Sequence, residues 1–209
     1  MLVHPWDAPL DESETWSFVR AQGFGHLVAP GSGRELPVVV PTQYLVQAAP
    51  EGGRPGIVLH LARPNPIWAA LEENPAVLLS VAGDWAYVPS AWKVIADEDP
   101  ALGIPTTYYA AAQLTGTAAV VDDDEGKLAI LRAQLASYEP EIPHADPSVH
   151  VRRLPGIRGI RITVGGVVGK FKYGGNVDAA HRQSIASRLA DRAGPGDAAA
   201  RSHLLRRMT

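Results

Sequence analysis

Short apolar stretches, many of them alternating with polar residues, are separated along this chain by glycine- and proline-rich breaks. This pattern is typical of a protein built from short strands with a few peripheral helices. Glycine turns are expected at residues 31–33 and 165–166. The predicted strands span residues 24–29, 36–42, 56–61, 76–81, 105–121, 156–164 and 167–173.

Amphipathic segments with polar N-terminal residues predict helices between these strands. The acidic run 122–124 is expected to cap one of them, and Asn176 is expected to cap the last. The predicted helices span residues 11–22, 67–73, 125–138 and 177–193. Because strands and helices do not alternate regularly, we expect an α+β, barrel-like fold rather than a parallel α/β fold.

Basic and polar residues lie together where a predicted strand gives way to a predicted helix. They are His60, Arg63 and Asn65. Backbone N–H groups at the start of a helix lack helical partners, and the helix dipole adds positive potential, so this corner suits an anion such as a phosphate.

An aromatic hairpin is predicted directly after the next strand. It carries Trp85, Tyr87 and Trp92. Aromatic side chains suit a flat ring attached to such a phosphate. The first hypothesis is therefore a bound, phosphorylated, aromatic cofactor.

The composition of the 209-residue chain is that of an ordinary globular protein, with 46% hydrophobic and 20% charged residues. The absence of cysteine excludes disulfides, zinc–thiolate sites and iron–sulfur clusters, and fits a reducing cytoplasm. No apolar run is long enough to span a membrane, and the N-terminus does not resemble a signal peptide. We therefore expect a cytoplasmic protein without a membrane segment.

Charge is unevenly distributed along the chain. Residues 1–149 hold 7 Lys and Arg against 19 Asp and Glu, whereas residues 150–209 hold 12 against 3. The basic part could bind an anion or nucleic acid, or the two parts could neutralise each other in the fold or in a dimer. The second interpretation is favoured because the basic residues are spread out. Without a helix-turn-helix pattern, sequence-specific DNA binding is poorly supported.

Common nucleotide and metal motifs are incomplete in this chain. Gly23 and Gly25 lack the third glycine of a dinucleotide fingerprint, and residues 165–170 are one residue short of a phosphate loop. The histidines show no metal-ligand spacing, so no metal site is expected.

Four segments with a distinctive composition follow one another along the chain. They are His60-Leu61-Ala62-Arg63 with Asn65 and Trp68, Gly83 with Ala86, Tyr87 and Trp92, Ile104-Pro105-Thr106 with Tyr109, and Gly169-Lys170-Phe171-Lys172 with Asn176. In this order they resemble segments of the PaiB-type family of FMN-binding negative transcriptional regulators. The chain departs from the family pattern at residues 89–93, 107–108 and 173–175.

The resemblance implies a split β-barrel of the flavin-reductase-like kind that works as a homodimer with FMN at the subunit interface. Arg63 would hold the phosphate, because a guanidinium matches phosphate oxygens bidentately. The basic C-terminal part would supply Lys170 and Lys172, which a strand places on one face. The cofactor-binding residues implied are Thr42, His60, Arg63, Asn65, Tyr87, Trp92, Thr106, Lys170 and Lys172.

Each of these residues also has a purely structural interpretation. Arg63 could pair only with Glu72 or Glu73, and His60 could be a hydrogen-bonded core histidine. The aromatic residues could belong to the core, and the two lysines could lie on a solvated strand face.

The resemblance implies an FMN-binding protein with a regulatory role. A flavin-dependent oxidoreductase stays an alternative, as does a barrel that has lost flavin and acts as a binding module. A related ligand such as another flavin or heme also stays open. The expected organisation is one FMN-binding domain over residues 1–193 followed by a basic tail over residues 194–209.

Overall fold

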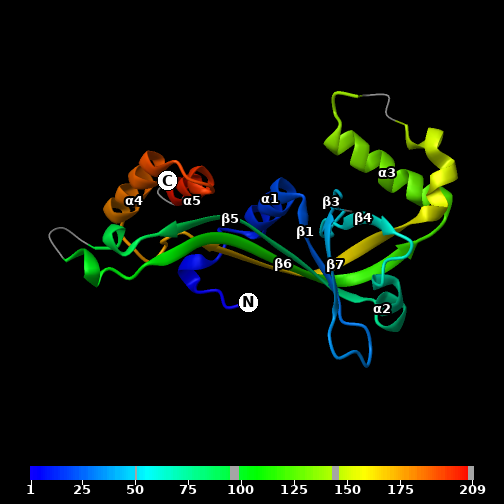
Figure 1. The fold of residues 1–209 in the computed structure, drawn as a ribbon, viewed down its shortest axis with the longest axis horizontal. Coiled ribbons are helices and arrows are strands. Elements are labelled where there is room, and N and C mark those ends of the chain that lie inside the picture. Colours follow the sequence, from blue (N-terminus) through cyan, green and yellow to red (C-terminus); the bar gives the residue numbers. More distant parts are fainter. Residues whose placement is uncertain (50, 95–98, 143–145, 207–209) are drawn as a thin grey trace. The chain divides into compact units, whose positions relative to one another are not determined.

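The computed structural model describes residues 1–49, 51–94, 99–142 and 146–206 and has mixed α+β architecture, as expected from the sequence (Figure 1). The 3₁₀ helices are η1 (Pro5–Asp7), η2 (Ser90–Trp92), η3 (Pro100–Leu102) and η4 (Pro147–Gly156). The α-helices are α1 (Glu12–Gln22), α2 (Ile67–Glu73), α3 (Asp124–Tyr138), α4 (Ala179–Arg192) and α5 (Asp197–Arg206). The strands are β1 (Phe24–Ala29), β2 (Val38–Gln43), β3 (Leu45–Val46), β4 (Ile57–Ala62), β5 (Ala76–Val88), β6 (Thr106–Val121) and β7 (Ile157–Lys172).

The strands form one seven-stranded sheet in the order β2-β1-β5-β6-β7-β4-β3. β1 pairs antiparallel with β2, so that Phe24 lies opposite Gln43, and also with β5. β4 pairs antiparallel with β7 and with β3. The β4–β7 pairing sets His60 opposite Gly159, and this register fixes the surroundings of the strand end that leads to Arg63.

The chain divides into two compact units. Unit 1 comprises residues 1–16, 82–112 and 168–209, and unit 2 comprises residues 17–81 and 113–167. β5, β6 and β7 each contribute residues to both units. The predicted boundary between a domain over 1–193 and a tail stays a prediction.

Unit 2 has aliphatic core residues and a fully buried tyrosine. Val58, Val121 and Ile130 are buried together, from β4, β6 and α3. α3 packs against η4 and β4. Tyr44 is 1% exposed, and its hydroxyl donates to the Val19 carbonyl at 2.7 Å. Burial raises the pKa of Tyr44, so this donor stays protonated.

Unit 1 is built around buried aromatic rings. Phe171 and Tyr173 are completely buried. The Tyr173 ring stacks on His203 at 4.5 Å, and its hydroxyl donates to the Asp84 carbonyl at 2.5 Å. α4 and α5 pack side by side (Figure 1). Burial of the Tyr173 hydroxyl without a hydrogen bond would be costly, so the Asp84 contact fixes this part of β5.

Two predicted turns are absent from the described residues, and longer strands replace them. β5 continues past Gly83 and Asp84, where the aromatic hairpin was predicted. β7 continues through Gly165 and Gly166, where a turn was predicted. Tight two-residue hairpins need residues with a positive φ. Neither Gly165 nor Gly166 has a positive φ, and of Gly83 and Asp84 only Asp84 has one.

Helix positions follow the sequence more closely than the turns do. α2 matches the predicted range, and Asp123 caps α3 by accepting from the Gly126 N–H. Asp178 rather than Asn176 caps α4, because its carboxylate accepts from the His181 N–H. Residues 197–206 of the predicted tail form α5, and residues 207–209 lie outside the described part. The 3₁₀ segment η4 lies between α3 and β7.

Candidate functional site

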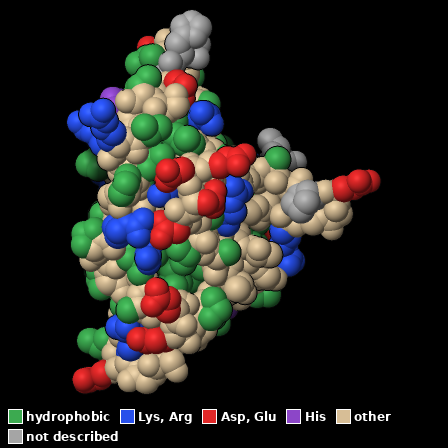
Figure 2. Space-filling model, turned by 90° about the vertical axis from the view of Figure 1, so that its right-hand side faces the viewer, with side chains coloured by type: hydrophobic (Ala, Val, Ile, Leu, Met, Phe, Trp, Pro, Cys, Tyr) green, Lys and Arg blue, Asp and Glu red, His purple; other side chains and the backbone are tan. Residues whose placement is uncertain are grey.

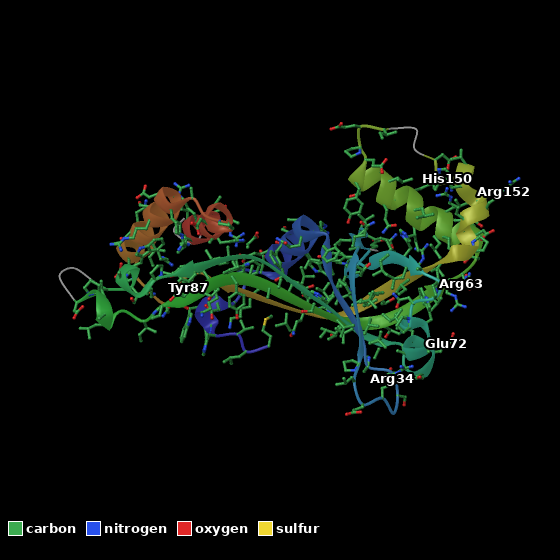
Figure 3. All side chains as sticks on the ribbon, in the orientation of Figure 1. Arg34, Arg63, Glu72, Tyr87, His150 and Arg152 are labelled. Atoms are coloured by element: carbon green, nitrogen blue, oxygen red, sulfur yellow. The ribbon has the colours of Figure 1, made fainter. Side chains whose placement is uncertain are left out.

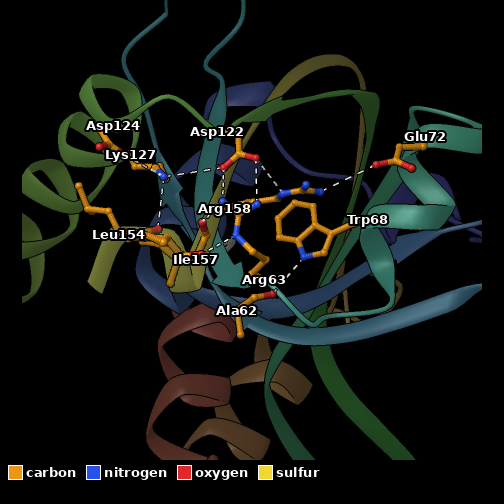
Figure 4. A network of polar contacts seen from close by, with 11 residues as sticks. Ala62, Arg63, Trp68, Glu72, Asp122, Asp124, Lys127, Leu154, Ile157 and Arg158 are labelled. Atoms are coloured by element: carbon orange, nitrogen blue, oxygen red, sulfur yellow. Dashed lines mark hydrogen bonds and ion pairs between the residues drawn. The ribbon is translucent and has the colours of Figure 1, made fainter. Parts of the chain in front are cut away.

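Arg63 lies directly after β4 and forms a two-pronged ion pair with Asp122. Its Nη1 donates to Oδ2 at 3.1 Å and its Nη2 donates to Oδ1 at 2.5 Å. Its Nε donates to the Pro155 carbonyl at 2.5 Å. The structural alternative of a pair with Glu72 or Glu73 is therefore wrong, since the acid that holds Arg63 comes from the end of β6 (Figure 4).

Asp122 is the centre of a network, here called the Asp122 network, that also contains Arg63, Asp124, Lys127 and Arg158. Arg158 Nε lies 3.1 Å and Lys127 Nζ lies 3.7 Å from the Asp122 carboxylate. The hydrogen bond from Arg63 lowers the pKa of Asp122, and the charges of Arg63, Arg158 and Lys127 add to this. Three cations therefore face one partly exposed carboxylate.

Two of these cations are held in place by neighbouring groups. Lys127 is 3% exposed, donates to the Leu154 carbonyl and lies 3.0 Å from Asp124. Arg158 lies over the Trp68 ring at 5.6 Å, with Glu72 3.9 Å away. Figure 3 shows Arg63 and Glu72 on neighbouring elements of unit 2. On the face that Figure 2 presents, basic and acidic side chains are interleaved.

Asn65 and Thr42 have local partners in unit 2. The Asn65 side-chain oxygen accepts from the Ile67 N–H at 3.0 Å, so it occupies a backbone donor that was expected to face an anion. Thr42 is 5% exposed, and its hydroxyl donates to the Gln43 carbonyl. Both side chains therefore form hydrogen bonds with the backbone near the strand ends.

His60 contacts Gln134 and lines a cavity. Its Nδ1 lies 2.7 Å from the Gln134 side-chain amide oxygen. The cavity, of about 590 Å³, lies between α3 and η4 and is also lined by His150 and Arg153.

The predicted lysines of β7 lie in unit 1 and flank one aromatic ring. Lys170 and Lys172 lie 5.5 and 5.9 Å from the centre of the Tyr109 ring, so the predicted common face is confirmed. Lys172 Nζ bonds the Thr106 hydroxyl at 2.8 Å. Lys170 is 8% exposed and donates to the Leu2 carbonyl, so for this lysine the solvated-face alternative is wrong.

Tyr87 and Trp92 also lie in unit 1, and both contact Arg192. Arg192 donates to the Tyr87 carbonyl at 2.8 Å, lies over the Trp92 ring at 4.7 Å, and pairs with Asp197. The Tyr87 side chain is half exposed, so it does not belong to the core (Figure 3).

The predicted site residues therefore fall into two groups. Thr42, His60, Arg63 and Asn65 belong to unit 2, and the other five belong to unit 1. The structure joins Thr106 to Lys172 directly. That all nine contact one cofactor stays a prediction.

Sequence reasoning missed Asp122, Lys127 and Arg158 as members of a network with Arg63. The acidic run at 122–124 was interpreted as a helix start, although Asp123 alone provides the cap. The available signal was an extra acid directly before a capping residue. Among the described residues, no cluster of three or more His, Asp or Glu has the arrangement of a metal site, and no helix there has the length and apolarity to cross a membrane.

Comparisons with known proteins point to a flavin. The model of the family described as "Putative FMN-binding domain" matches residues 1–165. The "Protease synthase and sporulation protein PAI 2" of Bacillus subtilis (strain 168) is 26% identical over 191 residues, which cover 87% of this chain and 86% of the relative.

Solved structures of similar fold include two described as cofactor-binding proteins. A flavocytochrome from Azotobacter vinelandii has a TM-score of 0.61 at 18% identity, over 85% of this chain and 75% of its own. An FAD and heme binding protein from Mycobacterium smegmatis has a TM-score of 0.59 at 18% identity, over 87% and 80%. At this identity the likeness concerns the fold alone, and it confirms the expected split β-barrel class.

Proposed function

This chain belongs to the PaiB-type family of FMN-binding domains, and on that premise we propose that it binds the FMN phosphate at the Asp122 network and uses flavin binding in a regulatory role. FMN is the cofactor that family membership indicates. When bound, it supplies the redox chemistry of its ring. The chain's own residues bind and orient it.

The observation that carries the proposal is the convergence of three cations on one carboxylate. Arg63 presents two N–H groups to the two oxygens of Asp122, and Arg158 and Lys127 approach the same carboxylate. A guanidinium that fits a carboxylate in this way also fits two oxygens of a phosphate. The donor set therefore fits the phosphate of FMN.

Asp122 is then an internal competitor for the phosphate. Its side chain is 41% exposed and does not cap α3, because Asp123 does. A phosphate would compete with the Asp122 carboxylate for the donors of Arg63. Arg158 and Lys127 also have the carboxylates of Glu72 and Asp124 near them, so the phosphate would have to take the donors of Arg63 from Asp122.

The regulatory role rests on the family resemblance. The relative's printed name concerns protease synthesis and sporulation. We infer that any regulation depends on whether flavin is bound, because the family is described by FMN binding and the relative by its link to protease synthesis and sporulation.

The experiment compares FMN with riboflavin, which lacks the phosphate, in fluorescence titrations. Arg63→Ala should weaken FMN binding roughly ten- to hundredfold, because it removes a charge-assisted contact of about 1.5–3 kcal/mol. Riboflavin binding should hardly change. Asp122→Asn should tighten FMN binding, because it removes the competing charge.

Arg34→Ala is the matched control. Arg34 forms a similar two-pronged pair with Glu73 in unit 2, so its loss reports the general cost of breaking such a pair. If Arg63→Ala weakened FMN and riboflavin equally, or if Asp122→Asn weakened FMN, Arg63 would act through the fold and the proposed phosphate position would be wrong.

A further inference from the structure

A second cavity, here called the α4 cavity, lies in unit 1 beside the start of α4. It has a volume of about 410 Å³. Its polar lining comes from Lys93, Asn176, Asp178 and His181. None of these belongs to the Asp122 network, so the cavity is a separate candidate for a ligand.

The α4 cavity carries one ammonium group in its lining and a second one nearby. Burial lowers the pKa of Lys93, and the charge of Lys172 adds to this. Lys172 bonds the Thr106 hydroxyl. Within the part of the chain that the structure describes, neither lysine pairs with a carboxylate. Asp178 lines the cavity, but its carboxylate accepts from the His181 N–H at the helix start.

Three buried polar atoms in unit 1, one of them on a residue that lines the α4 cavity, have no hydrogen-bond partner among the described residues. They are Tyr108 Oη, His181 Nε2 and Arg182 Nε. Tyr108 is 2% exposed. A Cβ built on Gly174 would lie 2.5 Å from Tyr108 Oη and 3.4 Å from Val177, a lining residue, which places this hydroxyl close to the cavity wall.

Unpartnered buried polar groups are rare in folded proteins, and a group of them commonly marks a bound ligand or water. Here the groups can all donate hydrogen bonds, and Lys93 is the cation in the cavity lining beside the helix-capping Asp178. Donors with cations recognise an oxyanion. Two ammonium groups match the two negative charges of a phosphate ester better than the single charge of a carboxylate.

We propose that the α4 cavity binds the phosphate group of a small organic molecule, with the phosphate between Lys93 and Lys172 and with Tyr108 and His181 as hydrogen-bond donors. Such a phosphate has two sources. It belongs either to a second small molecule or to FMN itself. The proposal stands independently of the phosphate position assigned to Arg63.

The test is a two-dimensional NMR titration of the full chain with inorganic phosphate at constant ionic strength, followed at His181 and Asn176. We expect saturable shifts, and a rise in the pKa of His181 when phosphate is bound. Lys93→Gln should weaken binding about tenfold or more, as expected for loss of a charge-assisted contact. Arg201→Gln, an exposed change on α5, removes the same charge and should bind phosphate as the wild type does.

Adding FMN or riboflavin to the titration distinguishes the two sources. If FMN but not riboflavin displaces phosphate, and Lys93→Gln weakens FMN binding while Arg63→Ala does not, the α4 cavity holds the FMN phosphate and the assignment to Arg63 fails. If FMN does not compete, the ligand is a second molecule.

The inference is overturned if His181 and Asn176 show no saturable shift. It is also overturned if Lys93→Gln and Arg201→Gln weaken phosphate binding equally, because general charge would then explain the effect. If Lys93→Gln lowers the unfolding temperature, the pKa of His181 is instead measured in the wild type with and without phosphate. A rise in that pKa supports the inference, and an unchanged pKa overturns it.

Discussion

At the scale of single residues, the identity of a charged group was easier to predict than its partner. The strand-to-helix position of Arg63 was visible from the sequence, but Asp122 lies 59 residues further along the chain. Only the pairing of β4 with β7 and the position of β6 beside β7 bring the two together. Sequence spacing does not reveal such long-range register, so a nearby acid was the natural expectation.

His203 gives unit 1 a dependence on pH. Burial lowers the pKa of His203, and the hydrogen bond to Asp84 offsets this in part. The folded protein therefore binds this proton less well than the unfolded chain does, whose histidine titrates at about 6.5. Stability should be unaffected by His203 above that pH and should fall as the pH drops below it. Thermal unfolding at about pH 7.5 and about pH 5.5 measures the effect.

The variant His203→Gln isolates this contribution, because glutamine can still donate to Asp84 but does not titrate. Its unfolding temperature should fall less on acidification than that of the wild type. His26→Gln, at an exposed position of β1, should behave as the wild type does. Equal slopes for wild type and His203→Gln would contradict the prediction.

At the scale of elements, capping residues and apolar spacing predicted helices well, while paired glycines misled. Gly165 and Gly166 have the composition of a turn but lie inside β7. A Cβ on Gly166 would lie 2.7 Å from the Thr115 hydroxyl, so close approach to β6 explains this glycine. Glycine serves both turns and close contacts, and composition alone does not separate the two.

Gly116 of β6 provides a test of this close approach. A Cβ there would lie 2.3 Å from the Thr163 carbonyl, a backbone atom that cannot rotate away. Gly116→Ala should therefore destabilise the protein by about 1–3 kcal/mol in urea unfolding, in the range of overpacked sites. Gly165→Ala, whose nearest atom would be 4.0 Å away, should be neutral or slightly stabilising. Equal losses would show that the steric explanation is wrong.

At the scale of the whole molecule, the uneven charge of the sequence is partly balanced inside each unit. Arg206 pairs with Glu14 and Arg192 pairs with Asp197 in unit 1, and Arg158 pairs with Asp122 in unit 2. Some of the basic C-terminal residues therefore form ion pairs within the fold. This agrees with the favoured interpretation of the sequence, in which the acidic and basic parts neutralise each other.

A homodimer stays a prediction of the family resemblance. Light scattering at micromolar concentration should give about twice the chain mass of 22.3 kDa. If the site needs both copies, FMN affinity should fall on dilution into the monomer range. A monomer that binds FMN with undiminished affinity would contradict the shared site.

The interrupted course of the chain through unit 1 has a consequence for its synthesis. Both segments of unit 2 have been made by residue 167, but residues 82–112 of unit 1 need residues 168–209 to complete their packing. Domains generally fold as units while the chain emerges from the ribosome. The middle segment of unit 1, with Tyr108 and the edge of the α4 cavity, is therefore made before unit 2 is complete but is buried only after it. A nascent chain stalled before residue 168 would leave that segment exposed.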